Sequence, residues 1–142
     1  MSRFTQELIL SPQGDGNWQV RNTELVWEVR VTFYEPGVIF PEPVPHELVV
    51  SEVEIPYGFV TDLASVPRIL WPIIASFGKH STAAVLHDYL YRKAGKHNWS
   101  RRWCDDQFYE AMLALGTHRF RAGVMYRAVR LFGQRSFQRP YR

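Results

Sequence analysis

The sequence lacks several features that would place it in a special class of protein. It has one cysteine, Cys104, which excludes a disulfide within the chain and the usual multi-cysteine zinc sites. Its longest apolar run, Ile69–Phe77, is interrupted by Pro72 and Ser76 and is far shorter than the roughly 20 residues that cross a bilayer. No apolar segment typical of a signal peptide follows Met1. We therefore expect a protein of a reducing compartment, with no signal peptide and no transmembrane segment.

The composition is that of a folded domain. The 142 residues are 46% hydrophobic and include five Trp, seven Tyr and nine Phe, which excludes a disordered or low-complexity chain. The length is typical of a single domain. We expect one domain, residues 1–142, with a β-rich part (1–60), a helical part (61–133) and a basic tail (134–142).

The net charge of +3 is unevenly distributed along the chain. Residues 1–60 contain three Arg and nine acidic residues, whereas residues 61–142 contain fourteen basic and five acidic residues. This division fits three interpretations: an anionic partner, head-to-tail assembly of copies of the chain, or two solvated faces. The sequence leaves all three open, and a homo-oligomer follows from the second.

The first sixty residues have the pattern of β-strands. Leu25–Tyr34 and Leu48–Ile55 alternate apolar and polar residues with period two and are rich in β-branched residues. The segment between them, Glu35–Pro45, holds four prolines, which forbid a central strand or a helix. A turn rich in Gly and Asn joins two further short strands, Glu7–Leu10 and Trp18–Arg21. These segments predict one small antiparallel sheet.

The second half of the chain has helical signals. A cap at Ser81 or Thr82 predicts a helix that ends near Lys93, before Gly95. A short turn or helix, Arg68–Trp71, lies between two prolines. Two further helices are expected at Arg101–Leu115, capped by Ser100 and closed by Gly116, and at Arg119–Phe132, closed by Gly133. The predicted fold class is α+β, with an N-terminal small antiparallel β-sheet followed by a three-helix C-terminal part.

Two of the predicted helices carry a candidate catalytic pair. Their connection, Lys93–Ser100, is short, so they should pack as an antiparallel hairpin that brings His87 against Asp105. A carboxylate facing a buried imidazole orients the ring, which is the arrangement that a general base needs. Tyr91, one turn after His87, could bond the same carboxylate. The alternative is that this His–Asp pair is only a satisfied polar contact within the core.

Two other carboxylates suggest a metal. Asp88 lies about 100° around the helix from His87 and could face the loop Thr61–Ser65, which contains Asp62. Carboxylates joined by loop carbonyls are the ordinary ligands of calcium, so Asp88 and Asp62 are the candidate Ca²⁺ ligands. The alternative for Asp62 is a cap on a turn that starts at Leu63.

Three stretches in the order Gly58–Arg68, Leu86–Arg92 and Arg102–Met112 resemble a family of phages and prophages that is catalogued only as a domain of unknown function. The resemblance covers about residues 55–133. It implies a viral or prophage origin and a location in the virion or the host cytoplasm. It implies no activity.

The motif His-Asp-x-x-Tyr, followed by an antiparallel helix that carries an Asp, is also similar to the core of phospholipases A-two, particularly the short bacterial forms. This resemblance implies that His87 activates water, Asp105 orients His87, Tyr91 supports the pair, and Asp88 binds calcium. The chain departs from that family in having no disulfides and no glycine-rich calcium loop before the helix. Only Gly58–Ser65 could take the place of that loop.

Three functions remain from the sequence. The first is a calcium-dependent ester hydrolase that uses His87 and Asp105, with a membrane lipid as a candidate substrate. The second is a virion component, such as a tail, baseplate or head–tail joining subunit, that binds other virion proteins and uses the motif for packing. The third is a small phage effector that binds a host factor through the basic tail, Arg135–Arg142. We expect no nucleic-acid partner, because no basic strand with interleaved aromatics and no recognition helix is present.

Overall fold

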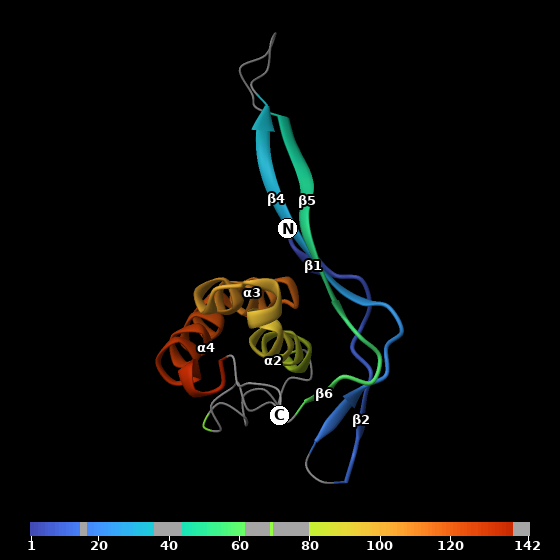
Figure 1. Cartoon of the computed structure of the whole chain (residues 1–142). Helices are drawn as coiled ribbons and strands as arrows, with labels where there is room; N and C mark the ends of the chain where they lie inside the picture. The colour runs from blue at the N-terminus through green and yellow to red at the C-terminus, as the bar shows by residue number, and fades with distance from the viewer. Residues whose placement is uncertain (15–16, 36–43, 62–68, 70–79, 138–142) are drawn as a thin grey trace.

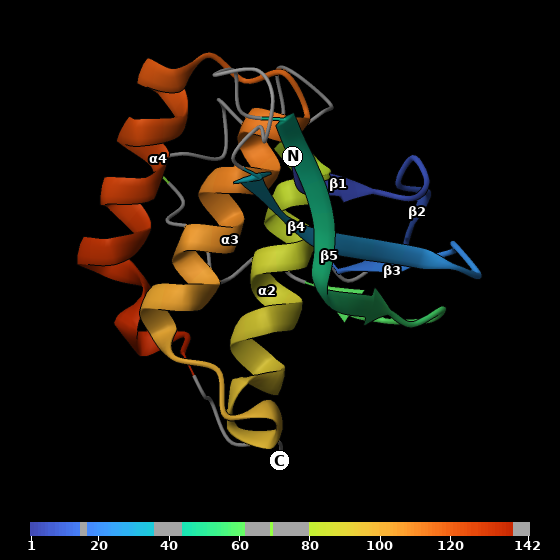
Figure 2. The ribbon, with the colours of Figure 1, turned by 90° about the horizontal axis from the view of Figure 1, so that it is seen from above.

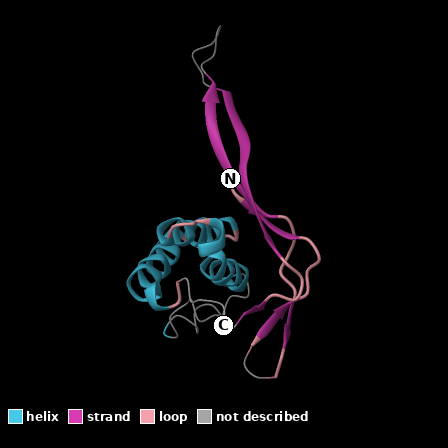
Figure 3. Ribbon diagram, viewed as in Figure 1, coloured by secondary structure: helices cyan, strands magenta, loops and turns pink. Residues whose placement is uncertain are grey.

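A computed structural model describes residues 1–14, 17–35, 44–61, 69 and 80–137, with strands in the first half and helices in the second (Figure 3). No helix among these residues combines the length and apolar composition that crossing a membrane would require. The strands are β1 (Arg3–Phe4), β2 (Leu10–Pro12), β3 (Trp18–Val20), β4 (Leu25–Glu35), β5 (Val44–Ile55) and β6 (Val60–Thr61). The helices are α2 (His80–His97), α3 (Arg101–Ala114) and α4 (Arg119–Phe132), followed by the short 3₁₀ helix η2 (Gly133–Arg135).

The predicted α+β class is confirmed, but the strands form two sheets instead of one. One sheet has the order β1–β4–β5 and the other has the order β2–β3–β6, and all of their pairs are antiparallel. The second sheet exists because the two-residue strand β6 returns beside β3, where Trp18 is paired with Thr61. A two-residue strand gives no periodic signal, so its pairing could not be read from the sequence.

Strands β4 and β5 form a long two-stranded ribbon that projects beyond the helices (Figure 1). We call this pair the ribbon. Its register runs from Leu25 opposite Ile55 to Glu35 opposite Val44, with an irregularity between Val29 and Arg30. Strand β5 thus begins before the predicted Leu48 and includes Pro45. A proline is tolerated there because β5 is the edge strand of its sheet and pairs only with β4.

The helix ends follow the predicted caps except in α2. Its predicted caps, Ser81 and Thr82, lie inside the helix, which includes His80. The Oγ of Ser100 accepts a hydrogen bond from the N–H of Trp103 at 3.1 Å, which caps α3. Helix α4 has the predicted bounds. Helix α2, however, continues through Gly95 and ends at His97, before Asn98 adopts a φ of 57°. The prediction that Gly95 closes this helix was therefore wrong, because an asparagine supplies the left-handed residue that ends it.

Two predicted segments lie mostly outside the described residues. Of the short turn or helix Arg68–Trp71, only Ile69 is described. The basic tail begins within η2, and its residues 138–142 are not described.

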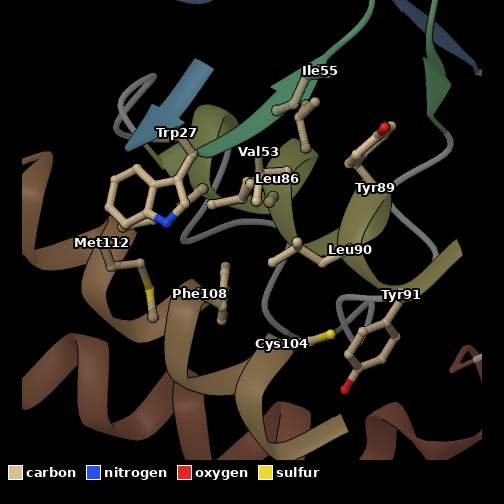
Figure 4. Packing of buried hydrophobic residues seen from close by; sticks show 14 of the residues in the cluster. Trp27, Val53, Ile55, Leu86, Tyr89, Leu90, Tyr91, Cys104, Phe108 and Met112 are labelled. Atoms are coloured by element: carbon tan, nitrogen blue, oxygen red, sulfur yellow. The ribbon is translucent and has the colours of Figure 1, made fainter. Parts of the chain in front are cut away.

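The main core joins the base of the ribbon to helices α2 and α3 (Figure 4). The indole of Trp27 is fully buried, and its Nε1 donates a hydrogen bond to the Oε1 of Gln107 on α3 at 3.0 Å. Phe108 and Met112 of α3 and Leu86 of α2 are also fully buried in this cluster. Seen from above, α2, α3 and α4 follow one another away from the strands, so α4 is the outermost helix (Figure 2). Trp27 is therefore the side chain that fixes the ribbon to the helical part.

We predict that Trp27→Ala lowers the free energy of unfolding by about 3–5 kcal/mol, because it leaves a large cavity and an unpaired Gln107 in the core. Trp18→Ala is the matched control, since the Trp18 side chain is 40% exposed and should have a much smaller effect. Urea unfolding followed by circular dichroism measures both. Equal losses for the two variants would contradict the role given to Trp27.

Candidate active site

The structure brings together the two residues of the candidate catalytic pair. The Nε2 of His87 on α2 lies 2.7 Å from the Oδ1 of Asp105 on α3, and both side chains are fully buried. The imidazole contacts two tilted aromatic rings, with centroids 4.1 Å from that of Tyr91 and 4.7 Å from that of Phe108. These contacts and the hydrogen bond to Asp105 restrain the ring.

Asp105 has two further partners. The hydroxyl of Tyr91 donates to Oδ1 at 2.5 Å, and the Nη1 of Arg130 on α4 donates to Oδ2 at 2.8 Å. The carboxylate therefore holds groups from two neighbouring helices. Tyr91 lies where the sequence placed it, one turn after His87.

The pKa directions follow from this arrangement. Burial alone would raise the pKa of Asp105, but its hydrogen bonds with His87, Tyr91 and Arg130 together lower it, so the group is ionised. Burial lowers the pKa of His87, and this outweighs the opposite effect of Asp105, so the imidazole is neutral at pH 7. Burial and the bond to Asp105 raise the pKa of Tyr91, which keeps its proton and acts as a donor.

These charges determine the tautomer of His87. Because Asp105 is an ionised acceptor, the neutral ring places its proton on Nε2 and leaves a lone pair on Nδ1. Nδ1 is buried and has no hydrogen-bond partner among the described residues. An unsatisfied buried polar atom lowers the stability of the folded state by roughly 1–3 kcal/mol. A side chain with a purely structural role gains nothing in return for this loss.

Asp88, a candidate calcium ligand, bonds to Thr61 and Arg92. The Oγ1 of Thr61 donates to its Oδ2 at 2.6 Å, and the Nη2 of Arg92 lies 3.1 Å from the same oxygen. The Nη1 of Arg92 also donates to the carbonyl oxygen of Val60 at 2.6 Å. Asp88 thus joins α2 to β6 through its Oδ2.

Calcium binding therefore finds no support in the described residues. No group of three or more His, Cys, Asp or Glu side chains in the described part of the chain could hold a metal ion. Asp62, the other candidate ligand, lies outside the described residues.

Cys104 is buried, and burial raises the pKa of its thiol to about 12, as expected for a small core residue that does not react.

Two arginines of this site were not found from the sequence. Arg130 pairs with Asp105, and Arg101 donates to the backbone carbonyl oxygens of Val129 and Arg130 at 3.4 and 2.8 Å. The only signal in the sequence was that α4 contains arginines and no acidic residue, so that an arginine on its inner side needs an acid from another helix.

A glycine on α4's end makes room for Tyr91. A Cβ built on Gly133 would lie 2.8 Å from the Tyr91 hydroxyl, too close for an unchanged structure. The φ of Gly133 is −75°, an ordinary value, so space and not backbone freedom requires a glycine here. The position of the Tyr91 hydroxyl on Asp105 therefore depends on Gly133.

A family model described as a protein of unknown function, DUF1353, matches residues 41–129, which is more than half of the chain. The chain belongs to this family. No curated protein and no solved structure matches it. In this DUF1353 chain the matched segment contains His87, Asp88, Tyr91 and Asp105, whereas Arg130 follows its last residue directly.

We predict that Gly133→Ala destabilises this DUF1353 protein by about 1–3 kcal/mol, because the added methyl group displaces the Tyr91 hydroxyl from Asp105. Gly123→Ala, also on α4, is the matched control. Its Cβ would meet nothing within 4 Å, so it should stabilise the helix by about 0.5–1 kcal/mol. Thermal and urea unfolding measure both. The loss should shrink in a Tyr91→Phe background, and an equal loss there would show that the hydroxyl is not the obstacle.

A second prediction concerns pH. Because the pKa of His87 is lowered on folding, the unfolded chain binds a proton that the folded chain does not, once the pH falls below the ordinary value of 6.5. The free energy of unfolding should therefore fall between about pH 8 and about pH 5.5, and His87→Gln should reduce this fall. The exposed His97 is the control position, since His97→Gln should keep the full pH dependence. The urea midpoint of unfolding, measured at each pH, tests this prediction. A steeper fall of the midpoint with decreasing pH in His87→Gln than in the wild type would contradict it.

Proposed function

We propose that this protein is a hydrolase in which His87 is the general base that activates water. The observation that carries the proposal is the unpartnered Nδ1 of a neutral, buried imidazole whose other nitrogen is fixed by an ionised carboxylate. Nδ1 has no hydrogen-bond partner among the described residues, so none of their serine, threonine or cysteine side chains is bonded to it as a nucleophile. Water is then the nucleophile that fits the site.

The proposed chemistry is the hydrolysis of an ester. Nδ1 takes a proton from water while the water oxygen attacks the carbonyl carbon, and Asp105 stabilises the imidazolium that forms. The imidazolium then gives this proton to the leaving alkoxide as the ester C–O bond breaks. The products are a carboxylic acid and an alcohol, and His87 returns to its neutral state. Tyr91 and Arg130 keep Asp105 ionised and in place throughout.

The substrate class comes from the resemblance to phospholipases A-two, which supports a lipid ester. The corresponding calcium role of Asp88 stays a prediction, because the Oδ2 of Asp88 bonds to Thr61 and Arg92 and Asp62 is not described. The proposal therefore routes no step through a metal. Because the imidazole is fully buried, it also requires a conformation in which water and substrate reach Nδ1.

The decisive variant is His87→Gln, whose side-chain amide can still donate to Asp105 but provides no base. We expect the wild-type protein to hydrolyse p-nitrophenyl esters of graded acyl length or phosphatidylcholine vesicles, and His87→Gln to lose about 10²–10⁴-fold in rate. Tyr91→Phe keeps the base and should lose less. Each substrate is assayed with added calcium and with chelator, which tests the calcium prediction separately.

Access to the ring is measured independently of substrate choice. Deuterium exchange at the imidazole C2 position, followed by mass spectrometry, gives a rate for each histidine. The proposal expects exchange at His87 that is slower than at the exposed His97 but measurable in the folded state. A wild-type protein that cleaves no ester, with a His87 that exchanges only on unfolding, would overturn the proposal.

That outcome would favour a second function, a structural subunit of a phage or prophage particle. The observation in its favour is the ribbon, which extends well beyond the helices (Figure 1). The ribbon carries exposed apolar side chains. The three sequence motifs also support a phage origin. Detection of the protein in purified particles at a fixed stoichiometry is the test, and its absence from particles would argue against this function.

A further inference from the structure

The apolar inner face of the ribbon continues beyond the helices that cover its base. Trp27 and Val53 are cross-strand partners on this face, and both are buried at the base of the ribbon. Farther along, Val31 is the partner of Leu48, and their side chains are 47% and 55% exposed. Alternate residues of a strand share a face, so Val31 continues the face of Trp27. The outer part of the ribbon thus exposes apolar side chains like those that pack against the helices at its base.

Helix α4 presents an exposed apolar stripe on its outer side. Phe120, Val124 and Leu131 follow one another at spacings of four and seven residues, which places them on one side of the helix. They are 74%, 43% and 75% exposed. We call these three residues the outer stripe. A pocket at its C-terminal end is lined by Leu131, Phe132, Gln134 and Arg135.

The two surfaces have opposite charge. From Arg119 to Arg135, α4 and η2 contain five arginines and no acidic residue. The ribbon strands contain five glutamates and one arginine. Glu52 and Glu54 alternate with Val53 and Ile55, so they lie on the opposite face of the ribbon from the apolar one; both are exposed, and no ion pair to either is found among the described residues. Glu28 and Glu47 are already paired with Arg30. The opposite net charges of the two surfaces therefore steer association at long range, while the apolar side chains make the contact itself.

The two surfaces cannot meet within one chain. The ribbon lies on the strand side of the molecule, whereas α4 is the helix farthest from the strands (Figures 1 and 2). The outer stripe lies on the side of α4 opposite to its buried residues, Ala122, Met125 and Val129. We propose that the ribbon of one copy docks on the outer stripe of α4 of a second copy. Within one chain, helices pack on the base of the ribbon. The proposed contact repeats this helix-on-ribbon packing between two copies.

Such a contact is heterologous, because it joins two different surfaces, and it propagates into a ring or a filament. The proposal does not depend on the hydrolase proposal, because its surfaces do not include His87. A second copy is favoured over nucleic acid because a phosphate backbone offers no apolar surface to bury the outer stripe. The ribbon offers an apolar face to the outer stripe, and its net negative charge attracts the basic helix.

Sedimentation velocity over a range of protein concentrations tests the proposal. Leu48→Lys alters the ribbon, Leu131→Lys alters the outer stripe, and Ile9→Lys changes a comparably exposed residue outside both surfaces. We expect the wild type and Ile9→Lys to associate as concentration rises, less so at high salt. Each of the other two variants should stay monomeric, with an unchanged unfolding temperature showing that it is folded.

The mixture of the two lysine variants gives the sharpest result. Each variant retains one intact surface, so an equimolar mixture should form a one-to-one dimer and nothing larger. Association of Leu131→Lys alone would indicate a ribbon–ribbon contact and would overturn the proposal. A wild-type protein that stays monomeric throughout would also overturn it, as would duplex DNA binding that replaces self-association.

Discussion

The packing of the three helices depends on the hydrogen bonds and the ion pair made by the carboxylate of Asp105. It lies on α3, accepts hydrogen bonds from His87 and Tyr91 of α2 through one oxygen, and pairs with Arg130 of α4 through the other. A buried charge is tolerated only when it is paired and hydrogen-bonded, and removing one partner of such a pair costs about 3–5 kcal/mol. The packing of the three helices against one another therefore depends on Asp105 being ionised, and the helices in turn supply the partners that keep it ionised.

The same constraint sets the chemistry available to His87. Asp105 fixes the proton on Nε2, so Nδ1 bears a lone pair that no described residue uses. Packing alone does not require this atom, since a buried polar group replaced by an apolar one of similar shape is often neutral or stabilising. A neutral imidazole with an oriented lone pair is, in contrast, what a general base requires. This difference is the argument for the proposed role of His87 as a general base.

Local rules account for the parts of this arrangement that could be predicted. The period-two segments gave the ribbon, the caps gave most helix ends, and a short connection placed His87 against Asp105 with Tyr91 one turn away. Arg130 could not be found because it is 25 residues from Asp105 and depends on how α4 packs on α3. The hairpin of β2 and β3 was predicted, although β2 spans Leu10–Pro12 and not Glu7–Leu10. The strand β6 escaped prediction for the same reason as Arg130, since tertiary packing, not propensity, pairs a strand of two residues.

Helix α4 links the site to the surface because it contains arginines and no acids. None of its arginines can be neutralised by a neighbour one turn away on the same helix, so each carboxylate partner must come from elsewhere. On the inner side, Arg130 finds Asp105 and completes the buried cluster. On the outer side, Arg119 and Arg127 are exposed beside the apolar outer stripe. The composition that stabilises the candidate active site from within thus leaves the opposite side of the same helix suited to an acidic, apolar partner.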